Sequence, residues 1–543
     1  MQTTRTRGRP ALSTARRRRR AAHSTADVRS GGAAALAVAA LPFALVLGLA
    51  AFDGGYYAPA WGWCALALAW ATLVAALGRR DTRVSADAIA WAGLVAALGG
   101  WIWLSATWSI SSTLTLLDGQ RVLAYVCAAA FVALAVKRTS VRPISAAVLA
   151  ATTIVTAYAV LRYGSTDGSA MAEPIGYSNA LGLLAVMGLL LALGFAADGG
   201  AARSAAVAAA VPLGACVYLT YSRGALVALA VGLVAMATLA TGKTRRLAVA
   251  SALGGIVVLA VLAGRTAATS ASLGTTLRGD VLTLATNDRD RYWAAAWQTF
   301  LDHPLLGSGA GTFERTWLLY RDVNLGVLDA HSLYLETLAE LGPIGLVLLD
   351  FICVLPLVAA WRSRSQPLVP AVAGAYVAYL IHAAVDWDWE MPVLTLTAFL
   401  FAGVLVAGGS DRSFQLTARA RTTLVGVVSL IGVVAFVGLI GNSALTAAVV
   451  DLEGGSPKSA EREARHARSW SLWSAEPERV LAVAAATQGD RRAAREHALA
   501  ALRRDPGNVR LWRLLWSVSP ADRMHAFQRI TTLDPHGPPP WAP

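Results

Sequence analysis

Charged residues are scarce in this chain of 543 residues, of which 15% are charged and 56% hydrophobic. Soluble globular proteins carry about 25% charged residues, so the composition excludes a soluble globular fold. Apolar runs of about 20 residues recur between short polar breaks, which is typical of transmembrane helices. The mean hydropathy of +0.52 agrees with this interpretation. We therefore expect an all-α, polytopic transmembrane helical bundle.

Motifs for metals, nucleotides and disulfides are also lacking. No Cys/His cluster has zinc spacing, no Walker loop is present, and no Asp-x-Asp pair marks a metal site for a nucleotide sugar. The four cysteines, Cys64, Cys127, Cys216 and Cys353, fall in four different apolar runs. They are expected to be buried thiols, and we expect neither a metal nor a cofactor.

Thirteen apolar runs predict about 12–13 transmembrane spans. They cover residues 31–51, 58–78, 84–104, 118–136, 142–161, 178–197, 204–221, 223–241, 246–264, 343–361, 368–385, 391–408 and 422–441.

The net charge of +14 is explained by topology. With the N-terminus inside, Lys and Arg gather in the even-numbered gaps and nearly vanish from the short odd-numbered gaps, which is the positive-inside bias. The excess of basic residues therefore does not indicate a nucleic-acid partner. The even gaps hold Arg79, Arg80, Arg83, Lys137, Arg138, Arg142, Arg203, Lys243, Arg245, Arg246, Arg362, Arg364, Arg412, Arg419 and Arg421.

The same alternation of inside and outside gaps divides the chain into five segments. Residues 1–30, with the Arg16–Arg20 run, form a basic cytoplasmic N-terminus, although an Arg-rich flank before an apolar stretch also suits a cleaved signal peptide. Spans fill 31–264 and 343–441, while 265–342 is a large extracytoplasmic loop and 442–543 an extracytoplasmic tail.

The tail shows Ala-rich helical patterning. Ala464 and Ala467 recur 34 positions later as Ala498 and Ala501, a spacing that suits tetratricopeptide-like helix pairs. A plain helical hairpin is the alternative. Such a tail is a possible binding surface for a protein partner.

The large loop predicts an outer cap of two helices. "RDRYWAAAWQTFLD" carries Trp293, Ala296, Trp297 and Phe300 on one stripe and stops before Pro304, and "HSLYLETLAELG" ends at Gly342 before Pro343. The Gly-rich 307–311 segment is interpreted as a tight turn.

Three arginines on the outer side are candidate phosphate ligands. Arg223 lies in the short turn "YSRGA", and Arg289 and Arg291 stand at the start of the first cap helix. A guanidinium binds phosphate bidentately and keeps its charge. A salt bridge to Asp288 or Asp290 is the simpler role for one of the pair.

His331 is the candidate general base. It opens the second cap helix, and the positive end of the helix dipole favours a neutral imidazole; a capping role is the alternative. Arg121 and Arg162 are secondary candidates at span ends, where snorkelling accounts for them. The pair His382–Asp386, one helical turn apart, is a reserve candidate, with hydrogen bonding inside the bundle as its more ordinary role.

These motifs resemble the O-antigen ligase and O-antigen polymerase family. The family's pattern of His, then Ser, Asn or Gln, and two later glycines is met by His331, Ser332, Gly342 and Gly345. "YSRGA" is similar to the family's Ser-Arg-Gly turn. "PIGYSNALGLL", which contains Asn179, and "HAAVDWDWEMP" also look like family segments, so Asn179 is a further secondary candidate. The resemblance covers roughly residues 30–440.

The resemblance implies a transferase in the bacterial cytoplasmic (inner) membrane that is metal-independent and uses an undecaprenyl-diphosphate-linked glycan. By this analogy Arg223 and Arg289 hold the diphosphate, with Arg291 as an alternative to Arg289, and His331 deprotonates the acceptor. Glycan, lipid and protein acceptors all occur in the family, so ligase, polymerase and protein O-oligosaccharyltransferase stay open. A transporter or flippase and a scaffolding protein are the alternatives from other classes.

Overall fold

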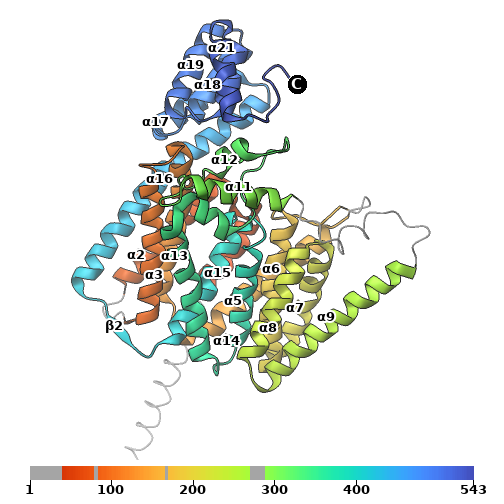
Figure 1. Cartoon of the computed structure of the whole chain (residues 1–543). Coiled ribbons are helices and arrows are strands. Elements are labelled where there is room, and N and C mark those ends of the chain that lie inside the picture. Colours follow the sequence, from red (N-terminus) through yellow and green to blue (C-terminus); the bar gives the residue numbers. More distant parts are fainter. Residues whose placement is uncertain (1–38, 79–82, 165–168, 269–287, 543) are drawn as a thin grey trace, which may run out of the picture.

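The computed structural model is a helical bundle, and it describes residues 39–78, 83–164, 169–268 and 288–542 (Figure 1). Among the described residues, nine helices are long and apolar enough to cross a membrane, and three shorter apolar helices accompany them. This confirms the all-α polytopic fold. Residues 1–30, Arg79, Arg80 and the part of the large loop at 269–287 lie outside the described residues.

Each of the thirteen predicted runs falls on a helix. These helices are Ala39–Ala50, α2 (Ala58–Leu77), α3 (Ala86–Ser105), α4 (Ser112–Ala135), α5 (Val141–Arg162), α6 (Ser178–Asp198), α7 (Ala201–Leu219), α8 (Arg223–Leu239), α9 (Gly242–Ala268), α13 (Leu333–Ser363), α14 (Val369–His382), α15 (Pro392–Gly409) and α16 (Ala418–Glu453).

The centre of the bundle is formed by α6 and α15. In these two helices 78% and 83% of the most apolar window is buried, against 22% in α7 and 28% in α16. The last two therefore turn most of their side chains towards lipid. Close packing inside the bundle uses small residues: a Cβ on Gly232 of α8 would lie 2.9 Å from the carbonyl oxygen of Gly374 in α14.

One end of the bundle carries basic residues in ion pairs. Strands β1 (Arg83–Ser85) and β2 (Ser413–Gln415) form a small antiparallel sheet there, with Arg83 opposite Gln415. Arg138 lies 3.1 Å from Asp411, and Arg362 lies 3.2 Å from Asp87. The basic residues Arg83, Arg138 and Arg362 all come from gaps that are predicted to face inside.

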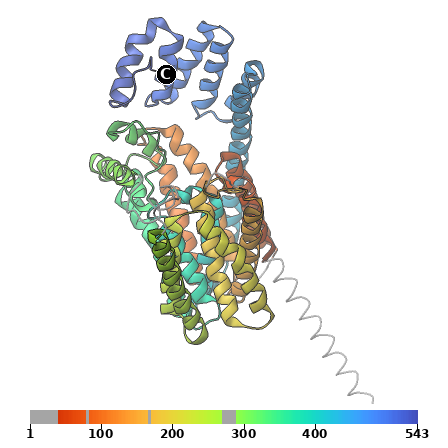
Figure 2. The same ribbon diagram turned by 90° about the vertical axis from the view of Figure 1, so that its right-hand side faces the viewer.

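The opposite end carries the cap (Figures 1 and 2). It consists of α11 (Arg289–Asp302), α12 (Phe313–Tyr320) and the first turns of α13. Helix α13 is interrupted at Gly342, whose φ of 65° suits glycine, so the cap part and the membrane-crossing part meet at the predicted Gly342–Pro343 junction. The short α12 is an addition to the two cap helices predicted, because eight residues are too few for a clear periodic signal.

The tail lies beyond the cap and is attached to it on two sides. Helix α16 runs without a break from the bundle to the tail and ends at Glu453. The tail helices follow it: α17 (Pro457–Trp470), α18 (Glu476–Thr487), α19 (Arg491–Arg504), α20 (Val509–Val518) and α21 (Arg523–Leu533) (Figure 2). On the other side, Arg315 of α12 lies 3.0 Å from Asp505, and Arg321 binds Asp534 through two nitrogens, at 3.0 and 2.8 Å. These pairs are buried.

Candidate active site

Arg289 is fixed at the start of α11 by a buried carboxylate. Its Nη2 lies 2.8 Å from Oδ2 of Asp386, which follows α14. The side chain of Asp386 is 2% exposed, whereas that of Arg289 is 22% exposed. The guanidinium therefore has one anchored side and one that remains accessible.

The Asp386 carboxylate is shared with the residues that lead into α6. The Tyr177 hydroxyl donates to Oδ1 at 2.7 Å, and the Asn179 side-chain amide donates to Oδ2 at 2.7 Å. Burial, together with the charge of Asp386, raises the pKa of Tyr177, so its hydroxyl stays protonated and remains a donor. Asn179 and Asp386, both secondary candidates, thus belong to the surroundings of Arg289.

Arg291 has other partners. Its guanidinium pairs with Asp288 at 3.2 Å and with Asp322, and its side chain is 37% exposed. Both partners are exposed, so the structure brings Arg289 but not Arg291 to the Asp386 cluster.

His331 stands just before α13, in a left-handed conformation with φ of 54°. Its Nδ1 lies 3.0 Å from the carbonyl oxygen of Asp329. Because a carbonyl only accepts, Nδ1 is the protonated nitrogen, and the neutral ring keeps its lone pair on Nε2. Burial lowers the pKa of His331 below its ordinary value, which favours this neutral form. Burial is the largest cause of the shift, and it outweighs the hydrogen bond to the Asp329 carbonyl, which raises the pKa.

Helix α11 also contacts His331 directly. The Tyr292 ring lies 5.1 Å from the imidazole, and the Trp293 indole nitrogen lies 3.5 Å from the His331 carbonyl oxygen. The amide of Leu333 donates to the carbonyl oxygen of Ala383 at 2.8 Å, which ties this segment to the end of α14. His331 and Arg289 are therefore held against the same two elements.

His382 and Asp386 do not form a pair, so that expectation is wrong. Helix α14 ends at His382, and the chain turns away before Asp386. The Nδ1 atom of His382 lies 2.9 Å from Asp388, and both side chains are fully buried. A Cβ on Gly224 would lie 2.8 Å from Nε2 of the same ring, so His382 packs against the turn that carries Arg223.

Arg223 is the first residue of α8, at the same outer end of the bundle. Ser222 caps this helix, its hydroxyl accepting a hydrogen bond from the amide of Ala225 at 3.1 Å. This N-terminal hydrogen bond of Ser222 fixes the backbone at the start of α8, where the Arg223 side chain begins.

Comparison with known proteins finds a match for part of the chain. Residues 208–349 match the family model described as O-antigen ligase. This segment is therefore similar to the O-antigen ligase family. The match spans 142 of 543 residues, and it includes Arg223, Arg289, Arg291 and His331. No curated protein matches the chain. Together with the apolar helices, the match supports a multi-pass membrane protein that transfers or ligates glycans.

The Gly-rich turn at 307–311 has a structural role. Gly307, Gly309 and Gly311 all have positive φ. The amides of Gly311 and Phe313 each donate to Glu340 at 2.8 Å, so these donors are already used within the protein. The prediction of a tight turn is confirmed.

Arg121 is buried, which contradicts the snorkelling interpretation. It forms ion pairs with Asp118 and Glu390, and it lies over the Trp61 ring at 5.5 Å from the centroid. Its side chain is 10% exposed. Two carboxylates thus compensate the charge inside the protein, and no route to lipid headgroups is needed. Arg162, by contrast, is exposed at the end of α5.

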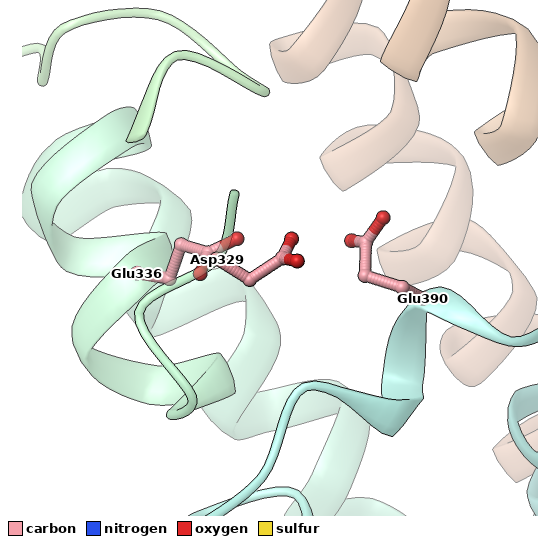
Figure 3. A group of neighbouring side chains, drawn as sticks. All are labelled: Asp329, Glu336 and Glu390. Atoms are coloured by element: carbon pink, nitrogen blue, oxygen red, sulfur yellow. The ribbon is translucent and has the colours of Figure 1, made fainter. Parts of the chain in front are cut away.

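Arg121 belongs to a cavity of about 350 Å³ between α3, α4, α13 and α15. Six carboxylates and one guanidinium line the cavity. Carboxylate oxygens of Asp329, Glu336 and Glu390 lie within 4.8 Å of one another, and Figure 3 shows Asp329 and Glu390 facing each other. Such a group could hold a cation.

Sequence reasoning missed this acidic group. Its members come from the end of the large loop, from α13 and from the segment before α15, and only tertiary packing joins them. One signal was available: Glu336 and Glu340 stand one turn apart in an otherwise apolar helix. Acidic residues on such a stripe indicate either internal partners or a polar cavity.

Proposed function

We propose that this protein transfers or polymerises a glycan from an undecaprenyl-diphosphate donor to an acceptor hydroxyl, on the outer face of the bacterial cytoplasmic membrane. The reaction is a single inverting displacement without a metal. Arg223 and Arg289 bind the diphosphate, and His331 is the general base. The observation that carries this proposal is that Arg289 and the His331 segment, both within the matched residues, are tied to the chain just after α14, through Asp386 and Ala383.

The donor capacity of Arg289 supports phosphate binding. A guanidinium has five N–H donors, and one nitrogen is used by Asp386. The Nε atom is buried, and no acceptor within the described part of the chain bonds to it. A diphosphate oxygen is the acceptor that such a group binds best.

The orientation of His331 supports general-base catalysis. With Nδ1 donating to the Asp329 carbonyl, Nε2 is free to take a proton. The acceptor oxygen attacks the anomeric carbon while the bond between that carbon and the diphosphate oxygen breaks. The hydroxyl proton passes to Nε2, and the lipid diphosphate leaves with the electron pair. One displacement inverts the anomeric configuration.

We also propose the topology that the charges predict. The cap, with the whole 265–342 loop, and the tail from 442 onwards face outside, while the N-terminal 30 residues and the basic loops face inside. The position of cap and tail at one end of the bundle supports this (Figure 1). A tetratricopeptide-like role for the tail, including binding of a protein partner, stays a prediction.

Ligase, polymerase and protein O-oligosaccharyltransferase activities share this chemistry and differ in the acceptor. A transporter or flippase would move the donor without consuming it. The test is reconstitution of the full chain in vesicles with undecaprenyl-diphosphate-linked glycan and glycan, lipid and protein acceptors. Transferred product and released undecaprenyl diphosphate are expected in equal amounts. Movement of intact donor with no released diphosphate would contradict the proposal.

A further inference from the structure

The cavity beside His331 is amphipathic. Its inner part is lined by apolar side chains such as Leu98, Ile102, Leu349, Ile352 and Phe399. Ile352 lies ten residues beyond the kink at Gly342, about 15 Å along α13 into its membrane-crossing part. This depth suits a hydrocarbon chain.

The outer part of the cavity is acidic and aromatic. Arg121 is the one cation among the described residues that line the cavity, and its charge is already compensated by Asp118 and Glu390. A phosphate group would find no uncompensated cation there, which is unfavourable in a partly desolvated site. The diphosphate therefore belongs on the Arg289 side and not in this cavity.

Sugar hydroxyls can hydrogen-bond to the carboxylates in the outer part of the cavity. Carboxylates accept hydrogen bonds from hydroxyls, and the rings of Tyr56, Trp61 and Trp389 offer apolar faces on which a sugar can lie. Within the described residues no donor is bonded to the Asp329 carboxyl. Burial raises the pKa of Asp329 to about 7, so near neutral pH this carboxyl can donate as well as accept a hydrogen bond.

Two short segments, 329–331 and 386–390, each have one side chain in the cavity and another on the side of Arg289. In the first, Asp329 points into the cavity while His331 faces Tyr292 of α11. In the second, Glu390 lines the cavity while Asp386 holds Arg289. His331 thus stands between a cationic region and an acidic one.

We propose that this cavity binds the acceptor, an amphipathic glycolipid whose head group is a neutral, hydroxyl-rich sugar, and that it rejects phosphorylated acceptors. The inference rests on the proposed function, because it assigns the second substrate of the same reaction. Donor and acceptor would then approach His331 from opposite sides.

Photo-crosslinking of the full chain in phosphatidylcholine nanodiscs tests this proposal. Two probes carry the same diazirine dodecyl chain, one with a glucose head and the other with a phosphate head. The glucoside is expected to label peptides around Ile102 and Ile352 at least tenfold more than the alkyl phosphate does. Equal labelling, preference for the phosphate, or no labelling of these peptides would overturn the proposal.

Variants sharpen the test. Ile352→Trp fills the inner part of the cavity and should abolish labelling by the glucoside. Val354→Trp, on the lipid-facing side of the same helix with 49% exposure, should leave it unchanged. Asp329→Asn removes, at constant size, the negative charge that this carboxyl carries above its pKa, so at pH 8 it should raise labelling by the alkyl phosphate. An unchanged phosphate signal would contradict the charge argument even if Ile352→Trp does not fold.

The binding assay needs no turnover, so the two proposals fail separately. Glucoside labelling without glycan transfer in any reconstitution would overturn the proposed function alone. Glycan transfer without glucoside labelling would overturn the assignment of the cavity alone.

Discussion

Asp386 holds one nitrogen of the Arg289 guanidinium at 2.8 Å, although the two residues are 97 positions apart. The carboxylate is buried and also accepts from Tyr177 and Asn179. A side chain with three such partners cannot follow a mobile arginine, so it acts as a fixed anchor. The orientation of Arg289 is therefore set before any donor binds, which lowers the entropy lost on binding.

Arg289→Ala should weaken donor use strongly, while Arg291→Ala should not. Loss of one charge-assisted contact costs about 1.5–3 kcal/mol, or roughly ten- to hundredfold in kcat/KM. Arg289→Lys should recover only part of the loss, because an ammonium does not bind bidentately. Steady-state transfer rates across donor concentrations measure this. Equal losses in Arg289→Ala and Arg291→Ala would remove the distinction between the two residues.

His331→Ala should lose about 10²–10⁴-fold in rate while donor binding survives. In the unmutated protein the rate should rise with pH as the imidazole loses its proton. Because burial lowers the pKa of His331, the plateau should be reached at a lower pH than an ordinary histidine with pKa 6.5 would give. A pH–rate profile checks both points. Retention of anomeric configuration, or a glycosyl–enzyme adduct, would contradict the mechanism.

Chelation of divalent cations should leave the transfer rate unchanged. A cation could bind, among the described residues, to the group formed by Asp329, Glu336 and Glu390. Chelation therefore tests whether a metal at this group contributes to the reaction. Rates are compared before and after EDTA, and again after Mg²⁺ or Mn²⁺ is added. Loss of activity that the added metal restores would show that the proposed metal-independent reaction is wrong.

Membrane-impermeant maleimide should label the tail but not the basic end in intact cells. The four native cysteines are buried, so background labelling should be low. Leu472→Cys, at a site 69% exposed in the tail, should react at once. Arg83→Cys should react only after the cells are permeabilised. The reverse pattern would invert the topology and place the site inside.

Asp534→Ala should loosen the tail. Removing one partner of a buried ion pair costs about 3–5 kcal/mol, because the other charge stays buried. Arg321 would be left in that position, so amide hydrogen exchange should rise in α20 and α21. Glu496→Ala breaks an exposed pair with Arg492, worth about 0–1 kcal/mol, and should leave exchange unchanged. Protection that persists in Asp534→Ala would mean that other contacts hold the tail.

Local patterns predicted the helices well. The apolar runs located the spans, and Gly342 next to Pro343 located the kink in α13, because length, hydropathy and backbone restriction act within one segment. The turn at 307–311 was also predicted correctly, since glycines with positive φ leave a local mark.

Relationships between distant segments could not be predicted. The spacing of four residues predicts a pair between His382 and Asp386. Because α14 ends at His382, the two side chains do not meet, and His382 pairs with Asp388 instead. For Arg121 the sequence predicts snorkelling at a span end. Its partner Glu390 comes from the segment before α15, and the sequence of α4 gives no sign of that contact. Partners supplied by another element are set by packing, which one sequence does not reveal.

The unbroken path of α16 has a mechanical consequence. Its 36 residues extend about 54 Å, against about 30 Å for the hydrocarbon core of a bilayer. The part of α16 that exceeds the thickness of the bilayer holds the tail away from the membrane, and the Arg321–Asp534 pair binds the other side of the tail to the cap. A body fastened at two points does not swing. The tail therefore keeps a fixed orientation relative to the cap.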